Sequence, residues 1–301
     1  MPQKHKISFI LNADHTGLSV DPKTLEAELR QAREEFDLDY IQFCMWDMGS
    51  LNVEHARKVT IPLLDKYGLK VSEFWCGFGV PAIWGGAGAQ YLGLVPPAFR
   101  HQRMQDYFRG MEYALELGVN TMCTEFGHYP DDPNDEKYVG LVVALQQIAI
   151  ELEKNDLYLL EETAAVPAPQ IRRLLNDVGS DRFGVNLDPA NITSSGKGEP
   201  LYFIDMLGPL IKSMHVKDAT HAVYPNFGGE AVRFGTGSVK FPEIFKKLKA
   251  LNYDGFFTLE DQRHMIHPGI VKRNAVDADT WAAQMKESVA LLSNMLDEAG
   301  F

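Results

Sequence analysis

The sequence predicts a (β/α)8 barrel, and three observations support this fold class. Short apolar segments alternate with helical patterns about eight times along the chain. Several of these segments end on an acid or a histidine, as is typical of the carboxyl ends of barrel strands. The 301 residues are 45% hydrophobic and show no linker-like change of composition, so we expect one domain over residues 1–301. A doubly wound open sheet is the alternative fold.

The first half of the chain is expected to form four strand and helix units. Strands are predicted at residues 7–11, 40–45, 69–76 and 119–124, because each is a short apolar run. A helix should begin at Asp21 and Pro22, which supply a cap and a first-turn proline. The second helix should end near Gly68, with an interruption at Pro62. Further helices are predicted over residues 99–117 and 137–154.

A long segment from about residue 77 to residue 98 separates the third strand from its helix. It is rich in Gly and Ala but also carries large apolar residues, including Trp84. Loops of this length in a compact domain are usually functional or disordered, and the apolar residues argue against disorder. We therefore expect a lid over the pocket, and a packed surface loop is the alternative.

The second half of the chain places a metal-capable side chain at the end of each strand. Strands five to eight are expected in LYLLE, FGVNL, IKSMH and GFFTLE, and they close on Glu161, Asp188, His215 and Glu260. Helices are expected over residues 169–179, about 201–207 and 281–296. The ends of barrel strands converge on one axis, and carboxylates with one imidazole suit Mn²⁺, Mg²⁺, Co²⁺ or Zn²⁺. The sequence therefore predicts a site for one divalent metal ion.

Four motifs in the chain resemble those of a known family. They are LEET, GVNLDPAN, HVKDA and GTGSVKFPEIFKKLKALNYDGFFTLE, within a resemblance that extends from Ile7 to Glu260. They are similar to the sugar isomerase/epimerase superfamily with xylose isomerase-like TIM barrels. Its members include ketose 3-epimerases, hydroxypyruvate isomerase, inosose dehydratase and, more remotely, endonuclease IV. The resemblance implies a metal held by Glu161, Asp188, His215 and Glu260.

The β-strand that should carry the first ligand offers two adjacent acids, and two other positions depart from the family pattern. Glu161 and Glu162 point to opposite faces of a strand, and Glu161 is favoured because the family's Glu follows a Leu, as it follows Leu160 here. Asn191 stands where ketose 3-epimerases place a His, and His221 stands where they place an Arg. Because Asn cannot titrate near neutral pH, the resemblance does not by itself assign a ketose 3-epimerase.

The implied chemistry is proton transfer beside a carbonyl group, catalysed by an isomerase or epimerase of a small sugar or keto sugar. The metal would stabilise an enediolate, while Glu161 and Glu260 would remove and return the carbon-bound proton. Lys217 should share a strand face with His215 and could orient or protonate an oxygen. Its alternative role is to pair with a surface acid. The candidate substrate-binding residues are Asn191, Lys217, His221, His128, Asn12 and Trp84, and a solvated loop position is the alternative for the loop residues among them.

Composition limits the other classes of function. A net charge of -12 argues against a nucleic-acid partner, because phosphate backbones are bound through clustered Lys and Arg. The sequence contains no apolar run of roughly 20 residues and no leader pattern, so we expect a cytoplasmic protein without a membrane partner. The GxGxxG and P-loop patterns of nucleotide sites are not found. The three cysteines are expected to be reduced packing residues, and a homo-oligomer is expected because soluble enzymes commonly form one.

Other functions are considered for the same chain. A metal-dependent sugar or inosose dehydratase would use the same site but expel a hydroxyl group after proton removal. A non-catalytic sugar-binding barrel would not need four clustered ligands. A DNA-repair hydrolase like endonuclease IV would need extra histidines for several zinc ions, and the chain has nine His in total.

Overall fold

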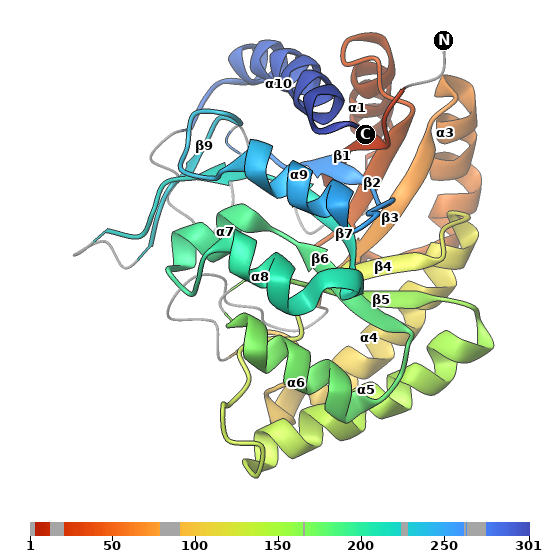
Figure 1. Cartoon of the computed structure of the whole chain (residues 1–301). Coiled ribbons are helices and arrows are strands. Elements are labelled where there is room, and N and C mark those ends of the chain that lie inside the picture. Colours follow the sequence, from red (N-terminus) through yellow and green to blue (C-terminus); the bar gives the residue numbers. More distant parts are fainter. Residues whose placement is uncertain are drawn as a thin grey trace.

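Eight parallel strands close into a barrel in the computed structural model, which describes residues 4–12, 21–78, 91–164, 166–223, 228–261, 263 and 275–301. The strand order around the barrel is β1, β10, β7, β6, β5, β4, β3 and β2. The first and last strands pair directly, with Ile7 opposite Phe257. Figure 1 shows the longer helices as a layer around the strands. The predicted (β/α)8 barrel is confirmed, and the closed order excludes the open sheet.

The elements have the following bounds. The barrel strands are β1 (Ile7–Asn12), β2 (Tyr40–Met45), β3 (Lys70–Cys76), β4 (Thr121–Thr124), β5 (Tyr158–Glu162), β6 (Phe183–Leu187), β7 (Ile211–Val216) and β10 (Phe257–Leu259). A separate two-stranded sheet pairs β8 (Asp218–Ala219) with β9 (Ala231–Val232). The helices are α1 (Pro22–Glu34), α2 (Val53–His55), α3 (Ile61–Tyr67), α4 (Pro97–Glu116), α5 (Glu136–Lys154), α6 (Ala168–Val178), α7 (Pro189–Ser195), α8 (Pro200–Leu207), α9 (Phe241–Ala250) and α10 (Ala278–Ala299).

Helix boundaries follow the capping residues that the sequence contains. The Asp21 side chain accepts a hydrogen bond from the Thr24 backbone N–H at 3.0 Å, which satisfies one of the free donors at the start of α1. Gly68 ends α3 in the left-handed conformation that glycine adopts without strain. The predicted interruption of the second helix is present, but it is a π-helical stretch over Ala56–Thr60 just before Pro62. Pro62 itself lies in the first turn of α3, where its missing N–H costs little.

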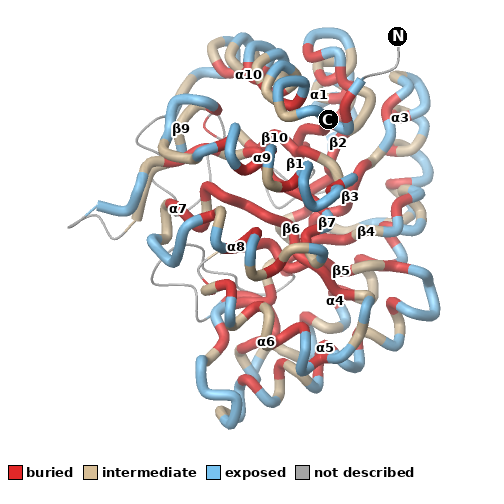
Figure 2. Tube along the Cα trace, in the orientation of Figure 1, coloured by how far each residue is buried: buried red, intermediate tan, exposed pale blue. Residues whose placement is uncertain are grey.

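Side chains of the barrel strands alternate between the layer beneath the helices and the barrel interior, and the interior is apolar beside β1 to β4. The outward-facing residues join one large buried cluster beneath the helices, which includes Phe9, Phe74 and Met122. Their sequence neighbours Ile10, Trp75 and Cys123 form, with Cys44, a small separate cluster inside the barrel. In Figure 2 the strands are mostly buried, and the helices around them are exposed on their outer faces. All three cysteines are buried and free, as predicted.

The connections that follow β3 and β4 contact each other at the end of the barrel where the strands finish. The central part of the predicted lid, residues 79–90 with Trp84, lies outside the described residues. Its last residues pack on the core, where the Leu94 N–H donates to the Phe126 carbonyl at 2.9 Å. A side chain on Gly93 would approach that carbonyl oxygen to 1.9 Å, so this close approach requires glycine.

Within the described ranges, none of the helices has both the length and the apolar character needed to cross a bilayer.

Candidate metal centre

Four side chains from four neighbouring strands meet at one end of the barrel. Glu162 is the last residue of β5, Asp188 follows β6, His215 lies near the end of β7, and Glu260 follows β10. Each of the four is buried, and one ligand atom from each lies within 4.8 Å of the others. The carboxyl ends of parallel barrel strands converge, which explains how residues about a hundred positions apart come together. The geometry gives three carboxylates and one imidazole around a single point.

The member of this cluster on β5 is Glu162, so the preference for Glu161 is corrected. Glu161 is buried on the outer face of the strand, where its carboxylate accepts a hydrogen bond from the Tyr129 hydroxyl at 3.3 Å. Burial raises the pKa of Glu161 well above its ordinary value. Glu162 points into the barrel, and its Oε2 accepts a hydrogen bond from Trp75 Nε1 at 2.7 Å. Adjacent strand residues face opposite sides, so only Glu162 reaches the cluster.

His215 presents its two ring nitrogens to different partners. Nδ1 lies 3.2 Å from Glu162 Oε1 and 3.0 Å from Glu260 Oε2, whereas Nε2 lies 2.9 Å from Gln42 Oε1. Burial lowers the pKa of His215, but the carboxylates of Glu162 and Glu260 outweigh burial and raise this pKa well above its usual range. Without another cation, the imidazolium is therefore one of the positive charges that balance the acids.

Lys217 supplies the second positive charge, and it lies at the same end of the barrel as His215. Its Nζ lies 2.7 Å from Glu260 Oε1 and 3.5 Å from Asp188 Oδ2. It also donates to Asn191 Oδ1 at 3.2 Å. Burial lowers the pKa of Lys217, but the negative charges of Glu260 and Asp188 raise this pKa by more than burial lowers it. The amine therefore stays protonated. The alternative pairing of Lys217 with a surface acid is not what the structure shows.

Asn191 reaches the cluster because of the short DPAN turn after β6. Asp188 caps α7, and its Oδ1 accepts a hydrogen bond from the Asn191 backbone N–H at 2.9 Å. The following Pro189 occupies the first turn of the helix, where no N–H is needed. The Asn191 side chain then donates to Glu162 Oε1 at 3.0 Å. Asn191 therefore bridges Glu162 and Lys217 at the rim of the cluster.

The donor atoms of the cluster fit a divalent cation. Asp188 Oδ2 and Glu260 Oε2 are buried and have no partner of good hydrogen-bond geometry, although Lys217 Nζ lies 3.5 Å from the first and His215 Nδ1 lies 3.0 Å from the second. Burial raises the pKa of Asp188 to about 7, even though Lys217 opposes this effect. Burial also acts to raise the pKa of Glu260, but Lys217 and His215 lower it to about 2. Buried carboxylate oxygens without donors are costly unless a positive charge lies beside them. Three hard oxygens and one nitrogen are ligands that Mn²⁺, Mg²⁺, Co²⁺ and Zn²⁺ accept.

Glu125 is a further acid at this end of the barrel to which no role was assigned from sequence. It directly follows β4, and the register of Thr124 opposite Glu161 places it beside Glu162 on the inner face. Burial and then the charge of Glu162 raise the pKa of Glu125 to about 8. The signal was present in the sequence, because TMCTE is another apolar run closing on an acid.

The other predicted substrate-binding residues are not brought to the cluster by the described contacts. His128 and His221 are both exposed. Burial, then the charge of Lys197, lowers the pKa of His128. Asn12 ends β1, but its side chain is outside the description, as is the whole of Trp84. The predicted substrate roles of these four residues are therefore untested.

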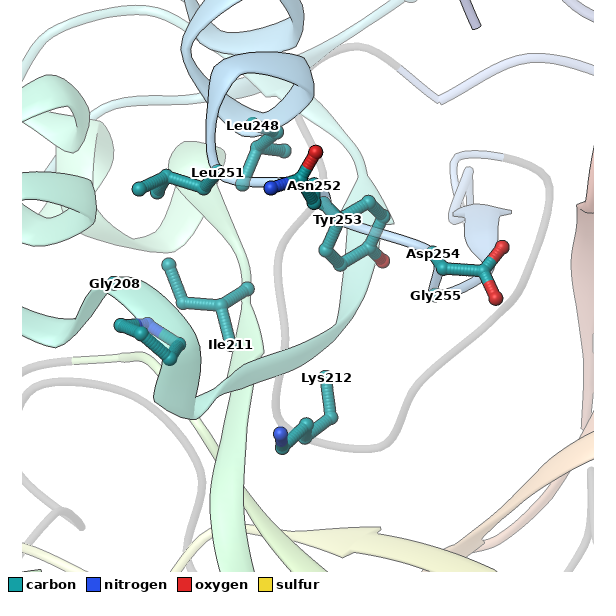
Figure 3. A pocket seen from close by; sticks show the side chains of 10 residues that line it. Gly208, Ile211, Lys212, Leu248, Leu251, Asn252, Tyr253, Asp254 and Gly255 are labelled. Carbon is teal, nitrogen blue, oxygen red and sulfur yellow. The ribbon is translucent and has the colours of Figure 1, made fainter.

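A hollow of about 360 Å³ lies at the opposite end of the barrel (Figure 3). It is lined by residues at the start of β7 and before β10, including Ile211, Lys212 and Tyr253. Barrel enzymes place their chemistry at the carboxyl ends of the strands. The hollow in Figure 3 is thus separate from the four-residue cluster.

Solved structures with the same fold cover almost the whole chain. A xylose isomerase domain protein from Planctomyces limnophilus has a TM-score of 0.80 at 21% identity, with 98% of each chain covered. An L-ribulose 3-epimerase has a TM-score of 0.71 at 18% identity, covering 97% of this chain and 95% of that chain. A xylose isomerase-like TIM barrel protein from Mycobacterium smegmatis in complex with magnesium has a TM-score of 0.67 at 17% identity, covering 93% and 90%. At these identities the likeness shows the fold alone.

Sequence comparison gives the family. An uncharacterised protein of Methanocaldococcus jannaschii is 22% identical over 164 residues, which are 50% of this chain and only 54% of that protein. The family model described as "Xylose isomerase-like TIM barrel" matches residues 29–295. This match spans most of the chain, and the protein therefore belongs to the xylose isomerase-like TIM barrel family.

Proposed function

We propose that this protein is a divalent-metal-dependent isomerase or epimerase of a small sugar or keto sugar. The observation that carries the proposal is the cluster of Glu162, Asp188, His215 and Glu260, whose ligand atoms lie within 4.8 Å of one another. Membership of a xylose isomerase-like family and the likeness to an L-ribulose 3-epimerase support a carbohydrate substrate. The magnesium complex of another family-like barrel supports a hard divalent cation.

The four cluster residues would hold the cation through three carboxylates and one imidazole. When bound, the cation would supply positive charge that stabilises the negative charge developing on substrate oxygens as a carbon-bound proton leaves. Its charge would also replace that of the His215 imidazolium, because a ligating nitrogen must be deprotonated. Trp75 lies inside the barrel beside the site, where its Nε1–H donates to Glu162 Oε2 at 2.7 Å.

The residues of the chain then divide the proton transfer between them. Glu162 and Glu260 are the paired carboxylates that remove and return the carbon-bound proton, with Glu162 in the role first expected of Glu161. Lys217 is positioned beside Glu260, where its ammonium can donate a hydrogen bond or a proton to a substrate oxygen. Asn191 can hold a substrate hydroxyl through its amide, although it cannot exchange a proton with it.

Dehydration of a sugar or inosose is the second candidate function. It is favoured by one observation, the contact of the Lys217 ammonium with Glu260 at 2.7 Å. A carboxylate that has taken a carbon-bound proton, next to an ammonium that can protonate a leaving hydroxyl, is the pair of groups that elimination of water requires. The residues that bind the cation would be the same in both reactions.

The test is an activity screen of the protein reconstituted with Mn²⁺ or Mg²⁺ against short ketoses, aldoses and inososes in D₂O. An isomerase or epimerase would place solvent deuterium on a carbon of a product with an unchanged skeleton, read by NMR. A dehydratase would instead give a product that has lost one water, read by mass spectrometry. EDTA and Glu260→Gln should each abolish the reaction, whereas Glu161→Gln should retain it. Turnover that survives both EDTA and Glu260→Gln would contradict the mechanism.

A further inference from the structure

A second polar layer lies inside the barrel beneath the metal centre. It consists of Gln42 on β2, Glu73 on β3, Asn186 on β6 and Ser213 on β7, and all four residues are at most 3% exposed. Buried polar groups in a barrel interior are costly unless their hydrogen bonds are complete. None of the four belongs to the cluster that would hold the cation, so their presence there requires another explanation.

The hydrogen bonds of this layer converge on the Glu73 carboxylate from two sides, one beginning at Asn186 and the other at His215. Asn186 Nδ2 donates to Ser213 Oγ at 2.7 Å, and Ser213 Oγ donates to Glu73 Oε1 at 3.2 Å. The second oxygen of Glu73 accepts from Gln42 Nε2 at 3.0 Å. The remaining atom of the Gln42 amide, Oε1, lies 2.9 Å from His215 Nε2. The layer is therefore a continuous path from Asn186 to the imidazole.

The carboxylate of Glu73 determines the orientation of every group in this path. Burial raises the pKa of Glu73 to about 7, so above that pH the carboxylate is ionised, and an ionised carboxylate accepts hydrogen bonds and cannot donate them. It therefore requires the amide nitrogen of Gln42 on its own side, which turns the amide oxygen toward His215. An amide oxygen is also only an acceptor, so His215 must carry a proton on Nε2. That leaves Nδ1 as the nitrogen with a free lone pair when a cation binds, and Nδ1 is the atom that faces Glu162 and Glu260.

We propose that Gln42 and Glu73 are positioning residues that determine which nitrogen of His215 binds the cation. The inference rests on the proposed metal-dependent function, and it adds two residues that touch neither the cation position nor the other acids of the cluster. Outer hydrogen-bond partners of metal-ligating histidines fix ring orientation and tautomer, and their loss typically weakens metal binding by about 10- to 100-fold. We expect losses in this range for changes at Gln42 and Glu73.

The experiment uses variants that change which groups of the path donate and which accept hydrogen bonds, with little change of side-chain volume. Glu73→Gln allows the Gln42 side-chain amide to flip by 180°, because the new amide at position 73 can present either a donor or an acceptor to it. Gln42→Met removes the acceptor for His215 Nε2. The double variant Gln42→Glu with Glu73→Gln restores the order, since the new carboxylate accepts from His215 and from the amide at position 73. Ser8→Ala is the matched control, because Ser8 makes a buried hydrogen bond to Thr258 at 2.7 Å and is not part of the path.

Two measurements are made on each folded variant. Mn²⁺ affinity is determined by calorimetry, and the ring nitrogens of His215 are observed by ¹⁵N NMR in the diamagnetic Zn²⁺ form. We expect roughly 10- to 100-fold weaker Mn²⁺ binding in both single variants, recovery in the double variant, and no change in Ser8→Ala. In the unmodified Zn²⁺ form, NMR should show a slowly exchanging Nε2–H and a metal-bound Nδ1.

The outcomes separate positioning from packing and from catalysis. Full Mn²⁺ affinity in Glu73→Gln, or a double variant that folds but stays weak, would overturn the proposal. Binding of Zn²⁺ through Nε2 in the unmodified protein would overturn it without any variant, so a variant that fails to fold leaves the proposal testable. A protein that shows the rescue but converts no sugar would contradict the proposed reaction and leave the role of Gln42 and Glu73 in place.

Discussion

Glu161 and Glu162 are neighbours on β5, yet their carboxylates lie on opposite sides of the barrel wall. Glu162 accepts a hydrogen bond from Trp75 inside the barrel, whereas Glu161 accepts one from Tyr129 under the helices. The two acids have the same chemistry and adjacent positions in sequence, but only Glu162 belongs to the four-residue cluster that could hold a metal ion. This pair therefore offers a direct internal control for the site.

Glu162→Gln should weaken Mn²⁺ binding by more than the roughly 10- to 100-fold that losing an outer partner costs, because a charged ligand is lost. Glu161→Gln should bind Mn²⁺ normally. Burial raises the pKa of Glu161 well above its ordinary value, and its carboxyl group lies on the outer face of the strand, away from the cluster, so a neutral amide should be tolerated there. Calorimetric titration of both variants with Mn²⁺ is the measurement. Equal losses of affinity in the two variants would mean that the assignment of faces is wrong.

Lys217→Met should destabilise the metal-free protein by about 3 kcal/mol, because removing one partner leaves buried charges uncompensated. The acids left behind are Glu260 and Asp188, which are 5% and 0% exposed in their side chains. Saturating Mn²⁺ should recover most of this loss by supplying positive charge at the same place. Urea unfolding with and without Mn²⁺ measures both effects. Lys212→Met is the control, because Lys212 lies on β7, the strand that Lys217 follows, but is exposed, and it should change stability by less than about 0.5 kcal/mol.

The stability of the metal-free protein should fall as pH rises from about 5 to 8.5. Burial raises the pKa of Asp188 to about 7 and that of Glu125 to about 8, so the folded state binds more protons than the unfolded chain in this range. Their stabilising contribution is complete below the ordinary carboxyl pKa near 4 and is lost as pH passes through the folded values. A cation must displace these protons, so its binding strengthens over the same window.

The measurement for this pH dependence is Tm with and without Mn²⁺ at pH 5.5, 7 and 8.5. The increase in Tm caused by Mn²⁺ should widen with pH. Glu125→Gln should flatten the metal-free curve between pH 7 and 8.5. Glu260 does not contribute in this window, since Lys217 and His215 hold its pKa at about 2 against the effect of burial. A metal-induced shift that is constant from pH 5.5 to 8.5 would contradict the protonated state of Asp188.

Gly237→Ala should destabilise the fold by about 1–3 kcal/mol, as overpacking in a close-packed region does. The carboxylate of Asp218 accepts hydrogen bonds from the backbone N–H groups of Gly235, Gly237 and Val239 at 2.8 to 3.3 Å. A Cβ on Gly237 would lie 2.2 Å from Asp218 Oδ1. Thermal unfolding measures the change, and Thr236→Ala in the same turn serves as the mild control. A Gly237→Ala protein as stable as Thr236→Ala would show that the turn relaxes freely.

The sequence predicted the barrel and three of the four cluster residues, because both follow from local patterns. An apolar run that ends on a polar residue marks the carboxyl end of a strand, and such ends converge in a barrel. The choice of Glu161 was wrong for a physical reason. Both faces of a buried parallel strand are apolar, so Leu159 and Leu160 are each fully buried and do not reveal which face is inside.

The supporting residues could not be predicted in the same way. Gln42 and Glu73 lie in the middle of β2 and β3, where no strand-end pattern marks them, and their contact with each other depends on a register shift between Ile41 and Gln42. His128 and His221 follow strands as the cluster residues do, but the path of a loop is set by tertiary contacts. Both side chains are exposed.

All four donor side chains come from one contiguous arc of the wall, formed by β5, β6, β7 and β10. The opposite arc, from β1 to β4, contributes Gln42 and Trp75. Gln42 makes a hydrogen bond with His215, and Trp75 makes one with Glu162. A chimaera that exchanged the first four units for those of a relative would keep every donor but replace the groups that orient them. Exchange of half the barrel would thus show whether the candidate ligands alone are sufficient for metal binding, or whether the residues that orient them are also needed.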